Sequence, residues 1–167
     1  MQIGKLMLPE FDDEMQKTRT MLERVPEDKP DFKPHAKSMP LGKLAAHVAR
    51  LPEFAAMILE EPSLDIAARK MKPLTLESRQ QLLADFESAA RQAREAIGKA
   101  TDADWEQKWR LSFQDKTIFE SPRFLAYRTM FLNHLVHHRA QLGVYLRLNE
   151  IPLPATYGPS ADDTMGF

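Results

Sequence analysis

The sequence predicts an all-α protein, a single four-helix bundle that spans residues 1–167. Apolar residues recur every three or four positions over four long segments, which is the period of an amphipathic helix. The 12 prolines stand mostly between those segments, while glycine occurs only 6 times. Because proline interrupts helices, this distribution predicts long helices joined by loops, as in a bundle with one long connection.

The first helix is expected over residues 9–25. Pro9 suits a first-turn position, and Pro26 then ends the helix. A proline-rich loop follows over residues 26–40. The side chains expected on one stripe of this helix are Phe11, Met15, Thr18, Leu22 and Val25.

The second helix is expected to begin between Ser38 and Leu41, with Ser38 as its N-cap. His47 lies beside the apolar stripe of this helix. Pro52 lies inside the pattern and should kink the helix just after His47, because proline removes one backbone hydrogen bond. The segment between Pro62 and Pro73 is predicted to be an irregular or helical connector.

The third helix is expected over residues 76–97, with Thr75 as N-cap and Gly98 just past its end. Residues 101–120 lose the helical period, which predicts a loop or a short hairpin. The fourth helix is expected to start at Ser121 and Pro122 and to run to about residue 149. A proline-rich tail follows.

The composition argues against several classes of function. Lys plus Arg number 23 and Asp plus Glu 24, so there is no basic excess for nucleic acid or for an anionic membrane. No apolar run approaches the roughly 20 residues of a membrane span, and a cytoplasmic location is expected. The absence of cysteine excludes disulfides, thiolate metal sites and a cysteine nucleophile.

Two histidines on the fourth helix are the first sign of chemistry. His134 and His138 are four residues apart, so both imidazoles project from one helix face. That face also carries Tyr127, Phe131 and Tyr145, which indicates that it points inward and that these three side chains line a substrate pocket. The spacing serves zinc motifs and ordinary helix faces alike, so the pair alone leaves both interpretations open.

His47 adds a third imidazole from the core side of the second helix. Side chains from facing helices of a bundle converge, and burying three imidazoles without a partner is costly. A shared divalent ion removes that cost. Three histidines with an open coordination position are typical of a catalytic or substrate-binding site, because structural zinc sites use four protein ligands. His35, in the proline-rich loop, is expected at the surface.

Two other groups of residues are interpreted as structural. Trp105 and Trp109 are expected to pack at one end of the bundle. Arg139 and Arg147 are each positioned to contact an anionic ligand, but a salt bridge to a neighbouring helix is the preferred interpretation.

The stretch HLVHHRAQLGVYLRLNEIPLPATYGPSADD closely resembles the C-terminal signature of the DinB family, also called DinB/YfiT-like proteins. The stretch KSMPLGKLAAHVARLPEF resembles the second-helix signature of that family. The resemblance implies a four-helix bundle with His47, His134 and His138 as ligands of nickel, zinc or a similar divalent ion. It also implies a homodimer. The family often has glycine where this chain has Ala140.

Three functions remain open on the sequence. The first is a metalloenzyme, either a hydrolase or a transferase or isomerase that uses a low-molecular-weight thiol, since some relatives resemble enzymes that use mycothiol, bacillithiol or glutathione. The second is a non-catalytic metal-binding or stress-related dimeric protein. The third is a helical bundle without a metal. Imidazole ligands suit several transition metals, so the sequence does not identify the ion.

Overall fold

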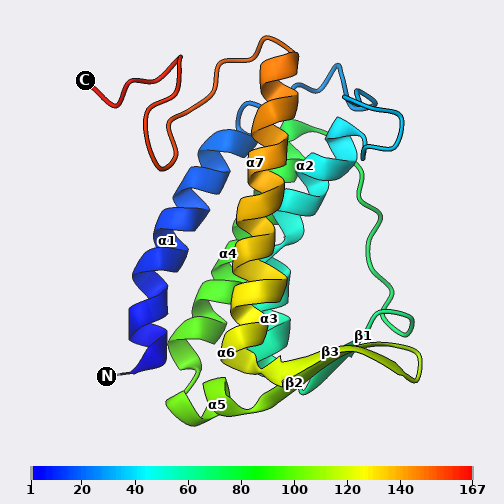
Figure 1. Ribbon diagram of the computed structural model, residues 1–167, viewed down its shortest axis with the longest axis vertical. Helices are drawn as coiled ribbons and strands as arrows, with labels where there is room; N and C mark the ends of the chain where they lie inside the picture. The colour runs from blue at the N-terminus through cyan, green and yellow to red at the C-terminus, as the bar shows by residue number, and fades with distance from the viewer. Residues whose placement is uncertain (1, 167) are drawn as a thin grey trace.

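The structure of the protein is a computed structural model, and it describes residues 2–166. The chain is mostly helical, and its long helices lie side by side along the long axis of the molecule (Figure 1). They are α1 (Ile3–Leu22), α2 (Leu41–Arg50), α3 (Pro52–Glu60), α4 (Arg79–Lys99) and the continuous run of α6 (Arg123–Ala126), η1 (Tyr127–Leu132) and α7 (Asn133–Leu148).

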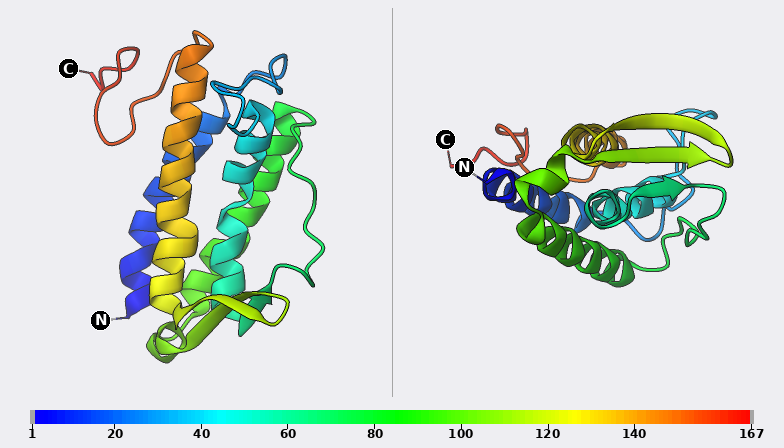
Figure 2. Two further views of the ribbon diagram at one scale, coloured as in Figure 1. Left: turned by 45° about the vertical axis from the view of Figure 1, so that its right-hand side comes forward. Right: turned by 90° about the horizontal axis from the view of Figure 1, so that it is seen from below.

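A small sheet covers one end of the helices, so the all-α expectation is wrong in this respect. The strands are β1 (Ser63–Asp65), β2 (Lys108–Phe113) and β3 (Lys116–Pro122), in the order β1-β2-β3. The hairpin of β2 and β3 confirms the prediction for this segment, and the short helix α5 (Asp102–Glu106) precedes it. Strand β1 pairs in parallel with β2 and is only three residues long, too short to show a period in the sequence. The view from below in Figure 2 shows the hairpin lying across the helix ends.

Helix α1 begins six residues before the predicted start, so Pro9 lies inside the helix and not in its first turn. The backbone N–H of Ile3 donates to Oδ1 of Asp102 at 2.7 Å, which caps the helix from a segment 99 residues away. Gly4 and Met7 in this added turn are buried. Tertiary contacts therefore stabilise a turn that the proline alone argues against. The helix ends at Leu22, three residues before the predicted end.

Two predicted helix caps are wrong, although α2 begins at Leu41, within the predicted range, while α4 begins three residues later than predicted. Pro40, and not Ser38, is the N-cap of α2, and no side chain caps it. Ser78, and not Thr75, caps α4, since its Oγ accepts from the backbone N–H of Gln81 at 3.0 Å. Helix α4 continues through Gly98 to Lys99. The break at Pro52 is confirmed, because α2 ends at Arg50 and α3 starts at Pro52.

The last long helix starts one residue late and contains a π-helical segment. Pro122 is its N-cap, and residues Tyr127–Leu132 form η1, closed by a bond from the Asn133 N–H to the carbonyl of Arg128. One extra residue per turn shifts the phase of the helix. The side chains after η1, which include His134 and His138, are thus turned relative to those before it.

The core fills the space between the helices and continues under the sheet. Phe11 of α1 packs against Phe131 at a ring separation of 6.0 Å. Trp105 and Trp109 are fully buried at the sheet end of the molecule, as expected. Within residues 2–166 no helix is both long and apolar enough to cross a membrane.

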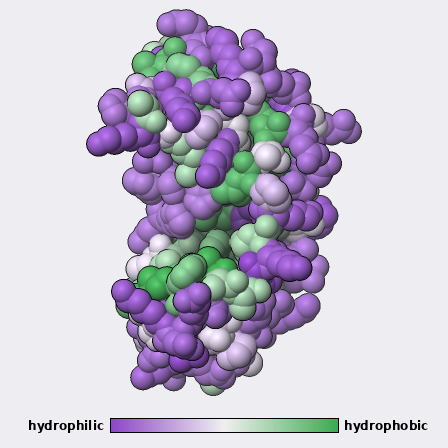
Figure 3. Space-filling view, turned by 90° about the vertical axis from the view of Figure 1, so that its right-hand side faces the viewer, coloured by the Kyte–Doolittle hydropathy of each residue, from purple (hydrophilic) through white to green (hydrophobic). Residues whose placement is uncertain are grey.

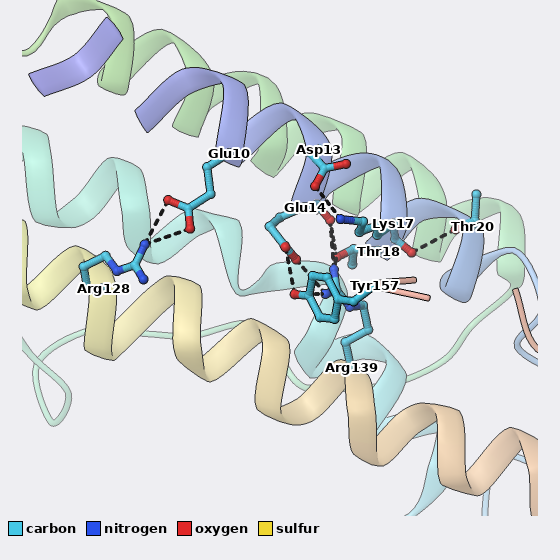
Figure 4. A network of polar contacts seen from close by, with 9 residues as sticks. All are labelled: Glu10, Asp13, Glu14, Lys17, Thr18, Thr20, Arg128, Arg139 and Tyr157. Carbon is cyan, nitrogen blue, oxygen red and sulfur yellow. Dashed lines mark hydrogen bonds and ion pairs between the residues drawn. The ribbon is translucent and has the colours of Figure 1, made fainter. Parts of the chain in front are cut away.

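A buried ion pair joins α1, α7 and the C-terminal tail (Figure 4). Nη2 of Arg139 lies 2.6 Å from Oε2 of Glu14, and both side chains are almost fully buried. Arg139 also donates to Oγ1 of Thr18 at 3.0 Å and to the Tyr157 hydroxyl at 2.7 Å. The Tyr157 hydroxyl in turn donates to Oε1 of Glu14 at 2.7 Å. The expected salt bridge of Arg139 to a neighbouring helix is thus confirmed, while Arg147 pairs with Asp162 of the tail.

Candidate metal centre

Three histidines from two neighbouring helices form the candidate site. His47 lies in the last turn of α2, and His134 and His138 lie one turn apart on α7. Helices α2 and α7 pack against each other, so the three imidazoles meet between them. All three residues are half-buried, and one ring nitrogen of each lies within 4.8 Å of the others.

The three imidazoles approach each other through their Nε2 atoms. Nε2 of His134 lies 3.3 Å from Nε2 of His47 and 2.9 Å from Nε2 of His138. The ring centroids of His47 and His138 are 4.6 Å apart and nearly perpendicular, at 81°. His134 is therefore the central residue of the group.

The π-helical segment supplies the partner that orients His134. Nδ1 of His134 lies 3.2 Å from the backbone carbonyl of Met130, which is in η1. A carbonyl only accepts, so Nδ1 carries the proton and donates. The neutral ring then has a lone pair on Nε2, directed at the other two histidines.

Gln141 orients His138 in the same way. Its Oε1 atom lies 2.8 Å from Nδ1 of His138, three residues earlier on α7. With this oxygen as acceptor, Nδ1 donates and Nε2 again presents a lone pair. Two lone pairs that face each other at 2.9 Å repel, and a cation bound between them removes the repulsion.

The surroundings favour neutral imidazoles. Burial, together with the positive charge that His138 and His134 would carry, lowers the pKa of His47 from 6.5 to about 4. Burial also lowers the pKa values of His134 and His138, although the hydrogen bonds to Met130 and Gln141 act in the opposite direction. Neutral imidazole is the form that binds a metal.

The donor set fits a divalent transition metal. At metal–nitrogen distances of about 2.0–2.1 Å, ligand nitrogens lie roughly 2.9 Å apart at a right angle and roughly 3.3 Å apart at a tetrahedral angle. The two Nε2–Nε2 distances at His134, 2.9 and 3.3 Å, fall at these values. Both acceptors, the Met130 carbonyl and the Gln141 amide oxygen, keep the proton on Nδ1, as acceptors bonded to metal-binding histidines generally do.

A sequence profile described as the DinB superfamily matches residues 10–142. The chain belongs to the DinB superfamily. The match includes all three histidines of the candidate site, the whole second-helix signature and the first nine residues of the C-terminal signature. No curated protein matches the chain.

Solved DinB-like structures share the fold. A DinB-like protein from Bacillus cereus ATCC 10987 has a TM-score of 0.69 at 18% identity, over 93% of this chain and 98% of that one. A DinB-like protein from Bacillus subtilis has a TM-score of 0.67 at 16% identity, over 86% and 91%. A putative member of the DinB family from Exiguobacterium sibiricum 255-15 has a TM-score of 0.60 at 17% identity, over 90% and 94%. At these identities the similarity concerns the fold alone.

The three aromatic residues expected in a substrate pocket lie in the core of this DinB protein. Tyr127 and Phe131 are fully buried, with ring centroids 5.1 Å apart, and Tyr127 also packs against Trp105. The Tyr145 hydroxyl donates to the backbone carbonyl of Met39 at 3.0 Å. Burial raises the pKa of the Tyr127 hydroxyl above its ordinary value of 10. Contact of these side chains with a substrate stays a prediction.

The cavity that does adjoin the site is lined by His47 and by apolar residues that the sequence did not single out. It has a volume of about 220 Å³ and lies between α2, α3 and the connector after β1. Figure 3 shows this side of the molecule, where the surface is hollowed and apolar groups gather in the hollow. The connector forms the outer wall through Met71 and Leu74. Its irregular sequence gives no pattern from which this position could be predicted.

The remaining histidines, His35 and His137, are not members of the group of three. His35 is exposed in the loop before α2, as expected. His137 is exposed, and its ring centroid lies 4.9 Å from that of His138 on the outer side of α7. The role of Gln141 could have been predicted, since it is a polar residue three positions after His138. The role of the Met130 carbonyl could not, because its contact with His134 depends on the π-helical turn.

Proposed function

We propose that this DinB protein binds one divalent ion, nickel or zinc, through the Nε2 atoms of His47, His134 and His138. The convergence of three neutral imidazole nitrogens, two pairs of them 2.9 and 3.3 Å apart, is the observation that supports this proposal. Three protein ligands leave coordination positions open for water or a small molecule. We further propose that the long helices form the four-helix bundle of the family and that the protein acts as a homodimer.

The proposed activity is that of a metal-dependent hydrolase or thiol-dependent transferase. A bound divalent ion would lower the pKa of a coordinated thiol or water and so supply a nucleophile at neutral pH. The chain has no cysteine, so the thiol has to come from a small cofactor. The histidines hold their donor atoms at fixed positions, because Met130 and Gln141 keep the Nδ1 protons in place.

Metal content tests the first part of the proposal. Protein purified without a histidine tag, stripped with a chelator and incubated with nickel or zinc should retain about one ion per chain after dialysis, as expected for a three-histidine site. His138→Ala should lose the ion, while His137→Ala, a neighbouring exposed histidine, should keep it. Less than a few tenths of an ion per chain in the unmodified protein would contradict the proposal.

Turnover tests the second part. The metal-loaded protein is mixed with a low-molecular-weight thiol and an electrophilic substrate, and separately with an activated ester for hydrolysis. We expect turnover that depends on the added ion and disappears in His134→Ala. Rates equal to the metal-free background with several thiols and esters would contradict catalysis but not metal binding.

One observation favours a second candidate, a non-catalytic metal-binding protein. The outer partners of the site are a backbone carbonyl and an amide, neither of which accepts a proton from a substrate at neutral pH. In that case removal of the ion should lower the midpoint of thermal unfolding, and there should be no catalytic activity to lose. A bound ion with no turnover is the result that would select this candidate.

A further inference from the structure

The cavity beside His47 has a position and a size that suit part of a ligand. His47 belongs both to the histidine group and to the wall of this cavity, so the two spaces adjoin at its side chain. The volume of about 220 Å³ is smaller than the roughly 300 Å³ at which drug-sized pockets begin. It therefore has room for a short chain or a single ring.

The walls of the cavity are mainly apolar, although the charged residues Arg50, Glu53 and Lys72 also line it. Its apolar side chains come from two sides, Leu51 and Phe54 from the helices and Met71 and Leu74 from the connector. The Arg50 guanidinium is already hydrogen-bonded within the protein. It donates to both carboxylate oxygens of Glu53 at 3.0 and 3.1 Å and to the backbone carbonyl of Lys72 at 2.7 Å.

Two consequences follow from the bonds of Arg50. The bond to Lys72 ties the connector to the helices, so the outer wall with Met71 is held in place. The ion pair with Glu53 balances the charge of the guanidinium, so Arg50 offers little to a charged ligand. The binding free energy of a ligand in this cavity should thus come mainly from the burial of its apolar surface.

We propose that the His47 cavity selects ligands in which a metal-binding head group is joined directly to a short, uncharged, apolar body. The head group would take an open position on the ion, and the body would lie against Leu51, Phe54 and Met71. This inference rests on the proposed metal site. It narrows the substrate class to small aliphatic or aromatic compounds, such as simple thiols.

A chain-length series measures this selection with the head group held constant. Cobalt(II) is loaded in place of the native ion, and straight-chain hydroxamates from acetohydroxamate to hexanohydroxamate are titrated against its visible absorption bands. Each methylene that enters the cavity should lower Kd about fourfold, the effect of burying one CH₂ group. The gain should stop once the chain fills the available volume.

A variant that fills the cavity provides the control. Met71 is 42% exposed, so Met71→Trp should fold normally while its ring occupies the space. We expect this variant to take up cobalt(II), because Met71 is not one of the three histidines, but to lose the dependence of Kd on chain length. Leu148→Trp, at an exposed position of α7 outside this cavity, should retain that dependence.

The outcomes separate the two proposals. A flat series in a protein that binds cobalt and acetohydroxamate would overturn the cavity proposal and leave the metal site intact. An unchanged series in Met71→Trp would do the same. A protein that takes up no cobalt would contradict the metal site, and the cavity proposal would fall with it.

Discussion

Nε2 of His134 lies 2.9 Å from Nε2 of His138, one helical turn further along α7. The Met130 carbonyl and the Gln141 amide oxygen hold the Nδ1 protons of the two rings, so each Nε2 faces the other with a lone pair. Without a cation this arrangement is repulsive. A cation bound between the two Nε2 atoms should therefore stabilise α7.

The first prediction concerns metal and thermal stability. Zinc or nickel added to the metal-free protein should raise its thermal midpoint, because an ion that binds only the folded state stabilises it by about 2.7 kcal/mol at 100 times Kd. The rise is measured by differential scanning calorimetry. His134→Ala should abolish it, whereas His35→Ala, at an exposed histidine of the loop, should not. An equal rise in both variants would place the ion elsewhere.

The second prediction concerns the pH dependence of the metal-free protein. The pKa of His47 is about 4 when folded and 6.5 when exposed, so the unfolded chain binds more protons between these values. The free energy of unfolding should therefore decrease as the pH falls from 6.5 towards 4. Urea titrations between pH 6.5 and 5 should show a steeper decrease in the unmodified protein than in His47→Gln. Identical slopes would show that His47 titrates normally.

The third prediction concerns Gln141. Replacing an outer hydrogen-bond partner of a ligating histidine lowers metal affinity about 10- to 100-fold. Gln141→Leu should have this effect, since leucine cannot accept a hydrogen bond from Nδ1 of His138. Gln141→Glu should retain the affinity for the metal, because its carboxylate still accepts that bond. Competition with a chromogenic chelator measures both variants. The side chain is exposed, so folding should be unaffected, and wild-type affinity in the leucine variant would refute the role.

The candidate site was predictable because its geometry is local. A spacing of four residues places His134 and His138 on one helix face whatever the rest of the chain does. To add His47 to the site, it was enough to assume that the apolar stripe of the second helix faces the core. The leucines near His47 indicate that it does. The acceptor on Met130 was not predictable, because it exists only where η1 replaces an ordinary helical turn.

The predicted secondary structure was wrong where contacts with residues far away in the sequence determine whether a helix or a strand forms. The first turn of α1 depends on Asp102, and strand β1 depends on pairing with β2 some 45 residues later. Ser78 replaced Thr75 as a cap although both are suitable residues, because the chain from Pro73 onward stays extended for longer than its sequence indicates. Local propensity ranks such alternatives only weakly.

The fourth prediction concerns the buried ion pair of Arg139 and Glu14. Arg139→Met would leave a buried carboxylate without its partner and should destabilise the protein by about 3–5 kcal/mol. Chemical denaturation of the single and double variants measures this. Adding Glu14→Gln should recover much of the loss, since the unpaired charge is then gone. Arg147→Met, which removes an exposed pair with Asp162, should cost far less, because solvent screens exposed ion pairs.

The fifth prediction compares two glycines at one end of the molecule. A Cβ on Gly4 would lie 2.6 Å from the backbone carbonyl oxygen of Ile97, so α1 and α4 would have to move apart. Gly4→Ala should therefore destabilise the protein by about 1–3 kcal/mol, as overpacking does.

Gly98, one residue further along α4, is the matched control, because a Cβ there meets no atom within 4 Å. Gly98→Ala should stabilise the protein by roughly 0.5–1 kcal/mol through helix propensity alone. Urea denaturation of both variants gives the comparison. Because Gly4 lies in the turn before Pro9, a neutral Gly4→Ala would show that this turn does not pack closely against α4.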